Sequence, residues 1–225
     1  MVEGERELYR ALEMGYNLKK LFFRSGTEGT LLEQYFDRSF ELSEKLFDRV
    51  SIRSGSEEVL AILEAKNHDL EQLQLHQDSR IMVIEAPEKP GNIGALLRTA
   101  AAAQLDAVII SNPKTDLYHP HIIRNSLGGI FALPIATEQS EKVISFLEKN
   151  QIHIISAALH AEAKHYKRIK YQKPFALVFG AEDKGLGGQW LKKSNQMVKI
   201  PVAFPIDSLN LSVSAGILIY HSTEQ

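Results

Sequence analysis

The 225-residue chain contains no cysteine, and this absence excludes several classes of site. Neither a disulfide framework nor a thiolate metal site can form, and the composition fits a reducing cytoplasm. No run of about 18 apolar residues occurs, so no membrane-spanning helix is predicted. The amino-terminal MVEGERELYR is charged and lacks the apolar core of a signal peptide. His119 and His121 are the closest histidine pair, but no third ligand stands at metal-binding spacing, so we expect no metal.

The charge is small overall and unevenly distributed. The formal net charge is −2, yet residues 1–75 carry 10 Lys/Arg against 15 Asp/Glu, and residues 76–225 carry 16 against 13. A polyanion would therefore have to meet local basic clusters rather than a uniformly basic surface. Two such clusters occur: Lys19, Lys20 and Arg24; and Lys164, Lys167, Arg168, Lys170 and Lys173. Composition alone favours the reading of both clusters as solvated faces.

The first third of the chain has the pattern of a small α/β unit. Helices are predicted over 3–15 with Gly15 at the end, over 29–36 capped near Thr30, and over 44–50 capped by Ser43; a strand is predicted over 18–23. The apolar segment 58–65 is either a strand or a buried helical turn, and periodicity does not decide. The chain then turns polar over 67–79, which predicts a domain over 1–72, a linker over 73–80 and a second domain over 81–225.

The second domain alternates strands and helices. Apolar strands are predicted over 80–86, 106–111, 130–136, 152–159, 174–180 and 196–201, with helices over 92–103, 120–126, 140–150 (capped by Ser140), 187–194 and 213–220. Strands that are apolar throughout and alternate with helices indicate an α/β fold with a mainly parallel sheet and helices on both faces. In such sheets ligands bind at the carboxyl ends of the strands.

Two of the loops after predicted strands have an unusual composition. In EKPGNIGALLRTAAA, Asn92 can cap the helix, and Arg98 lies on an otherwise apolar helix. Arg98 either forms a salt bridge with an acidic neighbour or clamps a phosphate, and both interpretations stay open. In LVFGAEDKGLGG, Gly180 and Gly185 bracket Glu182, without the spacing of a dinucleotide-binding or P-loop site. A glycine-rich turn with a solvated EDK is the alternative.

The third loop is SLNLS, at the entrance of the last helix. Free backbone N–H groups collect at a helix entrance, and Ser208 alone could cap the helix. Capping by Ser208 does not explain why Asn210 and Ser212 follow at alternate positions. No serine stands in a nucleophile elbow, so a Ser-His-Asp triad is not supported.

Taken together, these loops resemble the three motifs of the SpoU (TrmH-type) family of RNA 2′-O-ribose methyltransferases, in the SPOUT superfamily. The resembling segments are NIGALLRTAAA, LVFGAEDKGL and IPVAFPIDSLNLSVSAGILIY, with RNSLGGIFALP between the first two. They stand in order over roughly the last 145 residues. Residues 1–70 resemble, more weakly, the small ribosomal-protein-like RNA-binding domain that often precedes this catalytic domain.

The resemblance implies a SPOUT-like fold with a C-terminal trefoil knot and methylation of a ribose 2′-hydroxyl in RNA by S-adenosylmethionine. It implies a homodimer that associates through the C-terminal domain, and it favours ribosomal over transfer RNA. The implied catalytic residues are Arg98, Asn210, Ser208, Glu182 and Asn92, and the implied cofactor contacts are backbone groups of Gly180, Ile200 and Leu209. Because a guanidinium stays protonated, Arg98 is expected to clamp phosphate and stabilise the forming alkoxide rather than act as a base.

Two departures from the family pattern lead to further expectations. Phe204 stands where the family has Gly, which predicts weaker cofactor binding or a local rearrangement. Family members with this N-terminal domain usually begin tens of residues earlier, with a basic segment, so part of the usual RNA-binding surface is expected to be missing. The alternatives are a non-catalytic RNA-binding protein that retains the fold, a transfer-RNA methyltransferase, and a small-molecule enzyme on a similar sheet.

Overall fold

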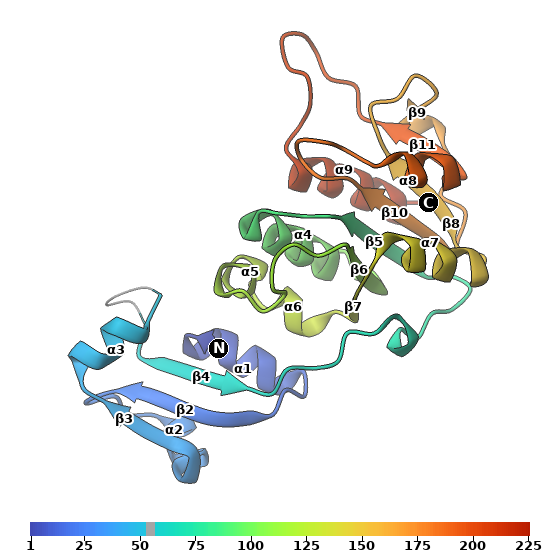
Figure 1. Ribbon diagram of the computed structural model, residues 1–225. Helices are drawn as coiled ribbons and strands as arrows, with labels where there is room; N and C mark the ends of the chain where they lie inside the picture. The colour runs from blue at the N-terminus through green and yellow to red at the C-terminus, as the bar shows by residue number, and fades with distance from the viewer. Residues whose placement is uncertain (53–56) are drawn as a thin grey trace.

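The computed structural model describes residues 1–52 and 57–225 and contains two β-sheets (Figure 1). The smaller sheet has the strand order β1-β4-β2-β3, in which β2 and β3 are parallel and the other pairs antiparallel. Its elements are β1 (Val2–Glu3), α1 (Glu5–Glu13), β2 (Leu18–Arg24), α2 (Thr30–Gln34), a 3-10 turn η1 (Phe36–Arg38), β3 (Ser39–Leu42), α3 (Glu44–Val50) and β4 (Val59–Leu63). The undecided segment 58–65 is therefore a strand.

The larger sheet is parallel throughout, with the strand order β7-β6-β5-β10-β8-β11-β9. Its strands are β5 (Arg80–Glu85), β6 (Ala107–Ser111), β7 (Ile135–Glu138), β8 (His153–Ala157), β9 (Lys164–His165), β10 (Phe175–Phe179) and β11 (Gln196–Lys199). The predicted α/β class with a mainly parallel sheet is confirmed. The trefoil knot stays a prediction.

Helices cover both faces of this sheet, as the apolar strands require. Met82 and Ile84 of β5 share a core with α4 (Pro90–Ala102), α5 (Pro120–Ser126), α6 (Gly129–Ala132) and α9 (Leu211–Thr223). Ile81 and Val83 point to the other face and pack with α7 (Ser140–Lys149) and α8 (Gly188–Lys193). Side chains alternate along a strand, so one apolar run serves two separate cores.

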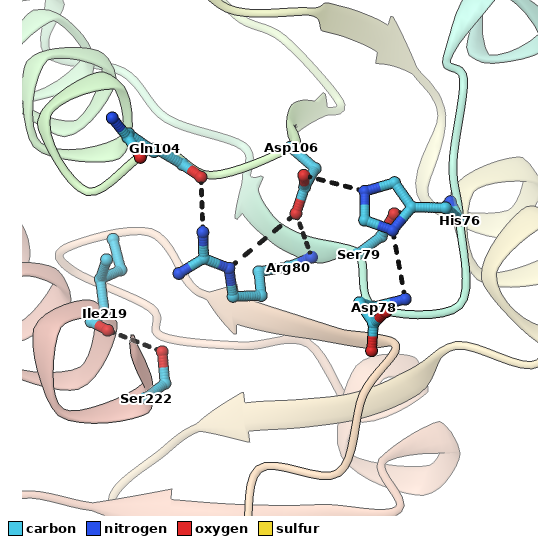
Figure 2. A network of polar contacts seen from close by, with 8 residues as sticks. All are labelled: His76, Asp78, Ser79, Arg80, Gln104, Asp106, Ile219 and Ser222. Carbon is cyan, nitrogen blue, oxygen red and sulfur yellow. Dashed lines mark hydrogen bonds and ion pairs between the residues drawn. The ribbon is translucent and has the colours of Figure 1, made fainter. Parts of the chain in front are cut away.

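A polar network fixes the chain where it enters the larger sheet (Figure 2). Asp106 Oδ2 accepts a hydrogen bond from the Arg80 backbone N at 2.7 Å, and Asp106 Oδ1 lies 3.1 Å from His76 Nε2. Arg80 Nη2 donates to the Gln104 carbonyl at 2.7 Å. These contacts lie at the amino end of β5, at the opposite end of the strands from their carboxyl ends.

The two sheets are joined by a continuous apolar core. Leu8 and Tyr16 of the N-terminal unit belong to the same buried cluster as Phe131 of α6, and the rings of Tyr16 and Phe131 meet edge to face at 5.0 Å. Arg10 Nη1 also donates to the Leu127 carbonyl at 2.6 Å. The N-terminal unit is thus packed firmly against α5 and α6. The division into two domains with a linker over 73–80 remains a prediction.

Three details differ from the sequence-based expectation. Residues 130–132 form α6 rather than a strand, because Gly128 adopts φ +89° and Gly129 packs directly on the backbone of α4. Ser140 is the first residue of α7 rather than its cap, and its Oγ donates to Glu85 at 2.5 Å. Asn92 does not cap α4.

Among the described residues, no helix is both long and apolar enough to cross a membrane.

Candidate active site

A cavity of about 820 Å³ opens at the carboxyl ends of β8, β10 and β11. Its walls come from the loops that follow these strands and from the entrance of α9, and it lies where a parallel sheet is expected to bind its ligand. Its size falls within the range of about 300–1,000 Å³ that small-molecule and cofactor sites occupy. Six residues predicted for the site line it together: Gly180, Glu182, Ile200, Ser208, Leu209 and Asn210.

The loop after β10 is a tight turn that folds back over Gly180. The Gly185 backbone N donates to the Ala181 carbonyl at 2.9 Å, and the two residues form an isolated antiparallel bridge. Gly185 has φ +64°, in the left-handed region that favours glycine. The two glycines that bracket Glu182 are therefore required by the backbone path, and this path brings main-chain groups to the cavity wall.

Glu182 is held by an ion pair with Lys89, which occupies the N-cap position of α4 without a side-chain hydrogen bond to the helix. The hydrogen bond to the carboxylate, followed by its charge, raises the pKa of the Lys89 ammonium. The pair ties the loop after β10 to the loop after β5, 93 residues apart in sequence. Lys89 also lines the cavity, and sequence reasoning missed it. Its position next to Pro90, directly after a strand, was the available signal.

Asn210, not Ser208, caps α9. Its Oδ1 accepts hydrogen bonds from the Ser212 backbone N at 2.9 Å and from Ser212 Oγ at 2.6 Å. The capping accounts for both Asn210 and Ser212, and it leaves Ser208 exposed at the cavity. In the part of the chain that the structure describes, Asn210 Nδ2 has no hydrogen-bond partner. An amide donor is therefore free beside the cavity.

Arg98 and Asn92 lie on α4, outside the lining of the cavity. Arg98 is exposed, and across residues 1–52 and 57–225 it forms no ion pair, so the salt-bridge interpretation of this arginine is wrong. Asn92 is half-buried at the third position of the helix, because Lys89 is the cap and Pro90 takes the first position. The helix that carries both residues packs against α9.

Phe204 is 98% exposed and stands outside the lining of the cavity. The turn that presents it is closed by a hydrogen bond of 3.0 Å from the Ile206 backbone N to the Ala203 carbonyl. A bulky residue at this position therefore fills none of the cavity volume. No group of three potential metal ligands occurs among the described residues.

The parallel sheet and its cavity define an α/β protein with a small-molecule site at the carboxyl ends of its central strands. The chain belongs to the SpoU rRNA Methylase family, whose family model matches residues 79–220. It is 26% identical over 221 residues to the 23S rRNA (guanosine(2553)-2′-O)-methyltransferase RlmP of Bacillus subtilis, covering 98% of this chain and 87% of the relative.

Solved structures of similar proteins match almost the whole chain. A structure of an S-adenosylmethionine-bound rRNA methyltransferase from Sinorhizobium meliloti has a TM-score of 0.90 and 26% identity, and the match covers 99% of this chain and 85% of that one. The crystal structure of an RNA 2′-O ribose methyltransferase has a TM-score of 0.84 and 33% identity, covering 99% and 87%. The matches include the N-terminal unit as well as the larger sheet.

Proposed function

We propose that this protein transfers a methyl group from S-adenosylmethionine to a ribose 2′-hydroxyl of ribosomal RNA. The observation that carries the proposal is the cavity at the carboxyl ends of β8, β10 and β11, where residues of the second and third motifs meet. Relatives that match nearly the whole chain are named for 2′-O-methylation of 23S rRNA or as rRNA methyltransferases. We therefore propose ribosomal RNA as the substrate and the cytoplasm as the site of action.

The walls of the cavity fit the cofactor. Gly180, Ile200 and Leu209 line the cavity, and their backbone groups are proposed to bond the adenosyl group, while Phe179 and Leu218 supply apolar surface. The bound sulfonium supplies an activated methyl group. The ion pair of Glu182 with Lys89 fixes the loop that covers this wall, and this ordering is the role proposed for Glu182.

The polar residues at the entrance of α9 are proposed to orient the ribose. Ser208 is exposed at the cavity and can bond the hydroxyl, and the free Asn210 amide can donate to its oxygen as the proton leaves. Arg98, which is exposed and has no ion-pair partner among the described residues, is proposed to clamp an RNA phosphate and stabilise the forming alkoxide. Asn92, six residues earlier on the same helix, is proposed to help place Arg98 or the RNA.

We propose that the protein acts as a homodimer through α9. The buried side of this helix carries Ala215, Leu218 and Ile219, yet the large apolar residues Val213 and Tyr220, seven positions apart on one face, are each 50% exposed. A second copy packed on that face would cover both residues. Because α4 lies against α9, the same packing would bring Arg98 of one copy close to the cavity of the other.

The proposal is tested by methyl transfer to unmodified 23S rRNA transcript. We expect the purified protein to bind S-adenosylmethionine in calorimetry and to transfer a radiolabelled methyl group from it to the transcript. Resistance of the modified nucleotide to alkaline cleavage would place the methyl on a 2′-oxygen. A flat titration at millimolar cofactor, or label on a base, would contradict the proposal.

A further inference from the structure

A strongly basic segment lies between β8 and β10, and the cavity does not account for it. Five cationic side chains are exposed there: Lys164, Lys167, Arg168, Lys170 and Lys173. Residues 160–173 contain one acidic residue, Glu162, against these five, while the chain as a whole has a net charge of −2. Within the described ranges none of the five forms an ion pair. We call these five residues the basic edge.

The basic edge starts beside the cavity and runs along the open side of the sheet. β9 is the last strand in the sheet order, and His165 is in register with Lys199 of β11, one residue before the cavity-lining Ile200. At the other end, Gln196 at the start of β11 donates through Nε2 to the Lys170 carbonyl at 3.4 Å. The cations therefore follow β11 over about 10 Å from the level of the cavity.

The base of this segment is packed, so the cations have a fixed support. The 3-10 turn η3 (Tyr166–Arg168) follows β9 directly, and the rings of His165 and Tyr166 stack with centroids 5.0 Å apart. His221 of α9 meets the Tyr166 ring edge-on at 5.1 Å. Lys167 Nζ lies 5.7 Å from the centre of the Tyr166 ring. The charged groups at this end extend from a half-buried aromatic cluster rather than from a loose loop.

We propose that the basic edge binds phosphates of the RNA whose ribose enters the cavity. This inference rests on the proposed function and adds a contact surface in the larger domain. Clustered lysine and arginine without acidic partners gain affinity for RNA by releasing the counterions of its backbone. The N-terminal unit lies against the opposite end of the sheet, near α5, α6 and β7 (Figure 1), and residues 1–75 carry an excess of five acidic residues. The basic edge is therefore proposed as an RNA contact surface separate from the N-terminal unit.

The competing explanation is protection of the sheet edge. Lysines on an edge strand also prevent pairing with other chains, and that role needs no RNA. The double variant Lys167→Ala/Arg168→Ala separates the two explanations. Its matched control is Lys149→Ala/Lys192→Ala, which removes from α7 and α8 two exposed cations that form no ion pair with any described residue. The probe is unmodified 23S rRNA transcript, with dissociation constants measured by filter binding between about 50 and 200 mM salt.

We expect the Lys167/Arg168 variant to bind the transcript about tenfold more weakly at low salt, with a slope of log K against log salt shallower by about 1.5. Its calorimetric affinity for S-adenosylmethionine should equal that of the parent, and the control should match the parent in every measurement. If both double variants bind the transcript alike, the basic edge only protects the strand and the inference fails. If the parent protein binds neither cofactor nor transcript, the proposed function fails as well.

Discussion

A Cβ on Gly180 would lie 2.2 Å from the carbonyl carbon of Gly185, across the turn that covers the cavity. Real Cβ atoms do not approach backbone this closely, so the turn can close only over a glycine. Because the opposing atoms belong to the main chain, no side chain can move aside to make room. The cavity wall therefore depends on residue 180 having no Cβ.

Gly180→Ala is expected to displace the turn and to lower the affinity for S-adenosylmethionine about tenfold or more. Overpacking of this kind costs about 1–3 kcal/mol, and 1.4 kcal/mol corresponds to a factor of ten. Calorimetry measures the affinity, and thermal unfolding checks that the fold is kept. Gly188→Ala is the control, because nothing lies within 4 Å of a Cβ there and α8 begins at this residue. Equal affinity of both variants would contradict the tight turn.

Arg98→Ala should lower methyl transfer by about 100-fold or more and leave cofactor affinity unchanged. Removal of one group that stabilises charge in a transition state has this size of effect. Arg98 is exposed and unpaired in the described structure, so the substitution should not destabilise the fold. Arg98→Lys keeps the charge and loses the planar fork, and we expect it to recover only part of the activity. Full transfer by Arg98→Ala would remove the proposed role.

Asn210→Asp separates the capping role of this residue from its role in the cavity. An aspartate keeps an oxygen that can accept from the Ser212 backbone N and hydroxyl, but it lacks the amide donor. We expect an unchanged melting temperature and loss of methyl transfer. Asn210→Ala should lose transfer and also about 1 kcal/mol of stability, because the cap is gone. Normal activity in the aspartate variant would show that only the cap matters.

The apolar residues within 80–86 and 174–180 predicted buried parallel strands, and the loops after them predicted the site. Both predictions need only local patterns, because strand direction places successive loops at one edge. Capping of α9 by Ser208 is one of the interpretations that the sequence leaves open, because the sequence does not show where the helix begins. The cap is Asn210, two residues later, which changes the interpretation of both side chains.

Contacts between segments far apart in the chain cannot be predicted from local sequence patterns. The ion pair of Lys89 with Glu182 joins two loops that no spacing rule connects, and it depends on how β5 and β10 lie side by side. The helical start of α6 depends likewise on Gly129 reaching the backbone of α4. Arg98 and Asn210 are both implied catalytic residues, but only Asn210 lines the cavity of this chain. In the proposed dimer, the partner copy would bring its Arg98 to this cavity.

Removal of the hydroxyl should affect the free energy of unfolding differently at two buried tyrosines. Tyr171 OH is buried without a hydrogen-bond partner in the described structure, and burial raises the pKa of this phenol to about 12. Tyr16 OH bonds Tyr118 OH at 3.1 Å. An unpaired buried hydroxyl is unfavourable, so Tyr171→Phe should leave stability unchanged or raise it by about 1 kcal/mol. Tyr16→Phe should lower it by about the same amount, and urea unfolding measures both. Destabilisation by Tyr171→Phe would reveal a hidden partner.

Val213→Glu is expected to convert the proposed dimer into a monomer. The substitution places a charge on the exposed apolar face of α9, and burying that charge against a second copy would be strongly unfavourable. Light scattering coupled to gel filtration measures the mass, and we expect half the mass of the parent protein. Methyl transfer should fall with dimerisation, since Arg98 is proposed to reach the cavity of the other copy. The control is Leu46→Glu on α3, where an apolar side chain is 44% exposed in the N-terminal unit. A parent protein that is monomeric and fully active would overturn the dimer, and a monomeric but active Val213→Glu variant would show that each chain holds a complete site.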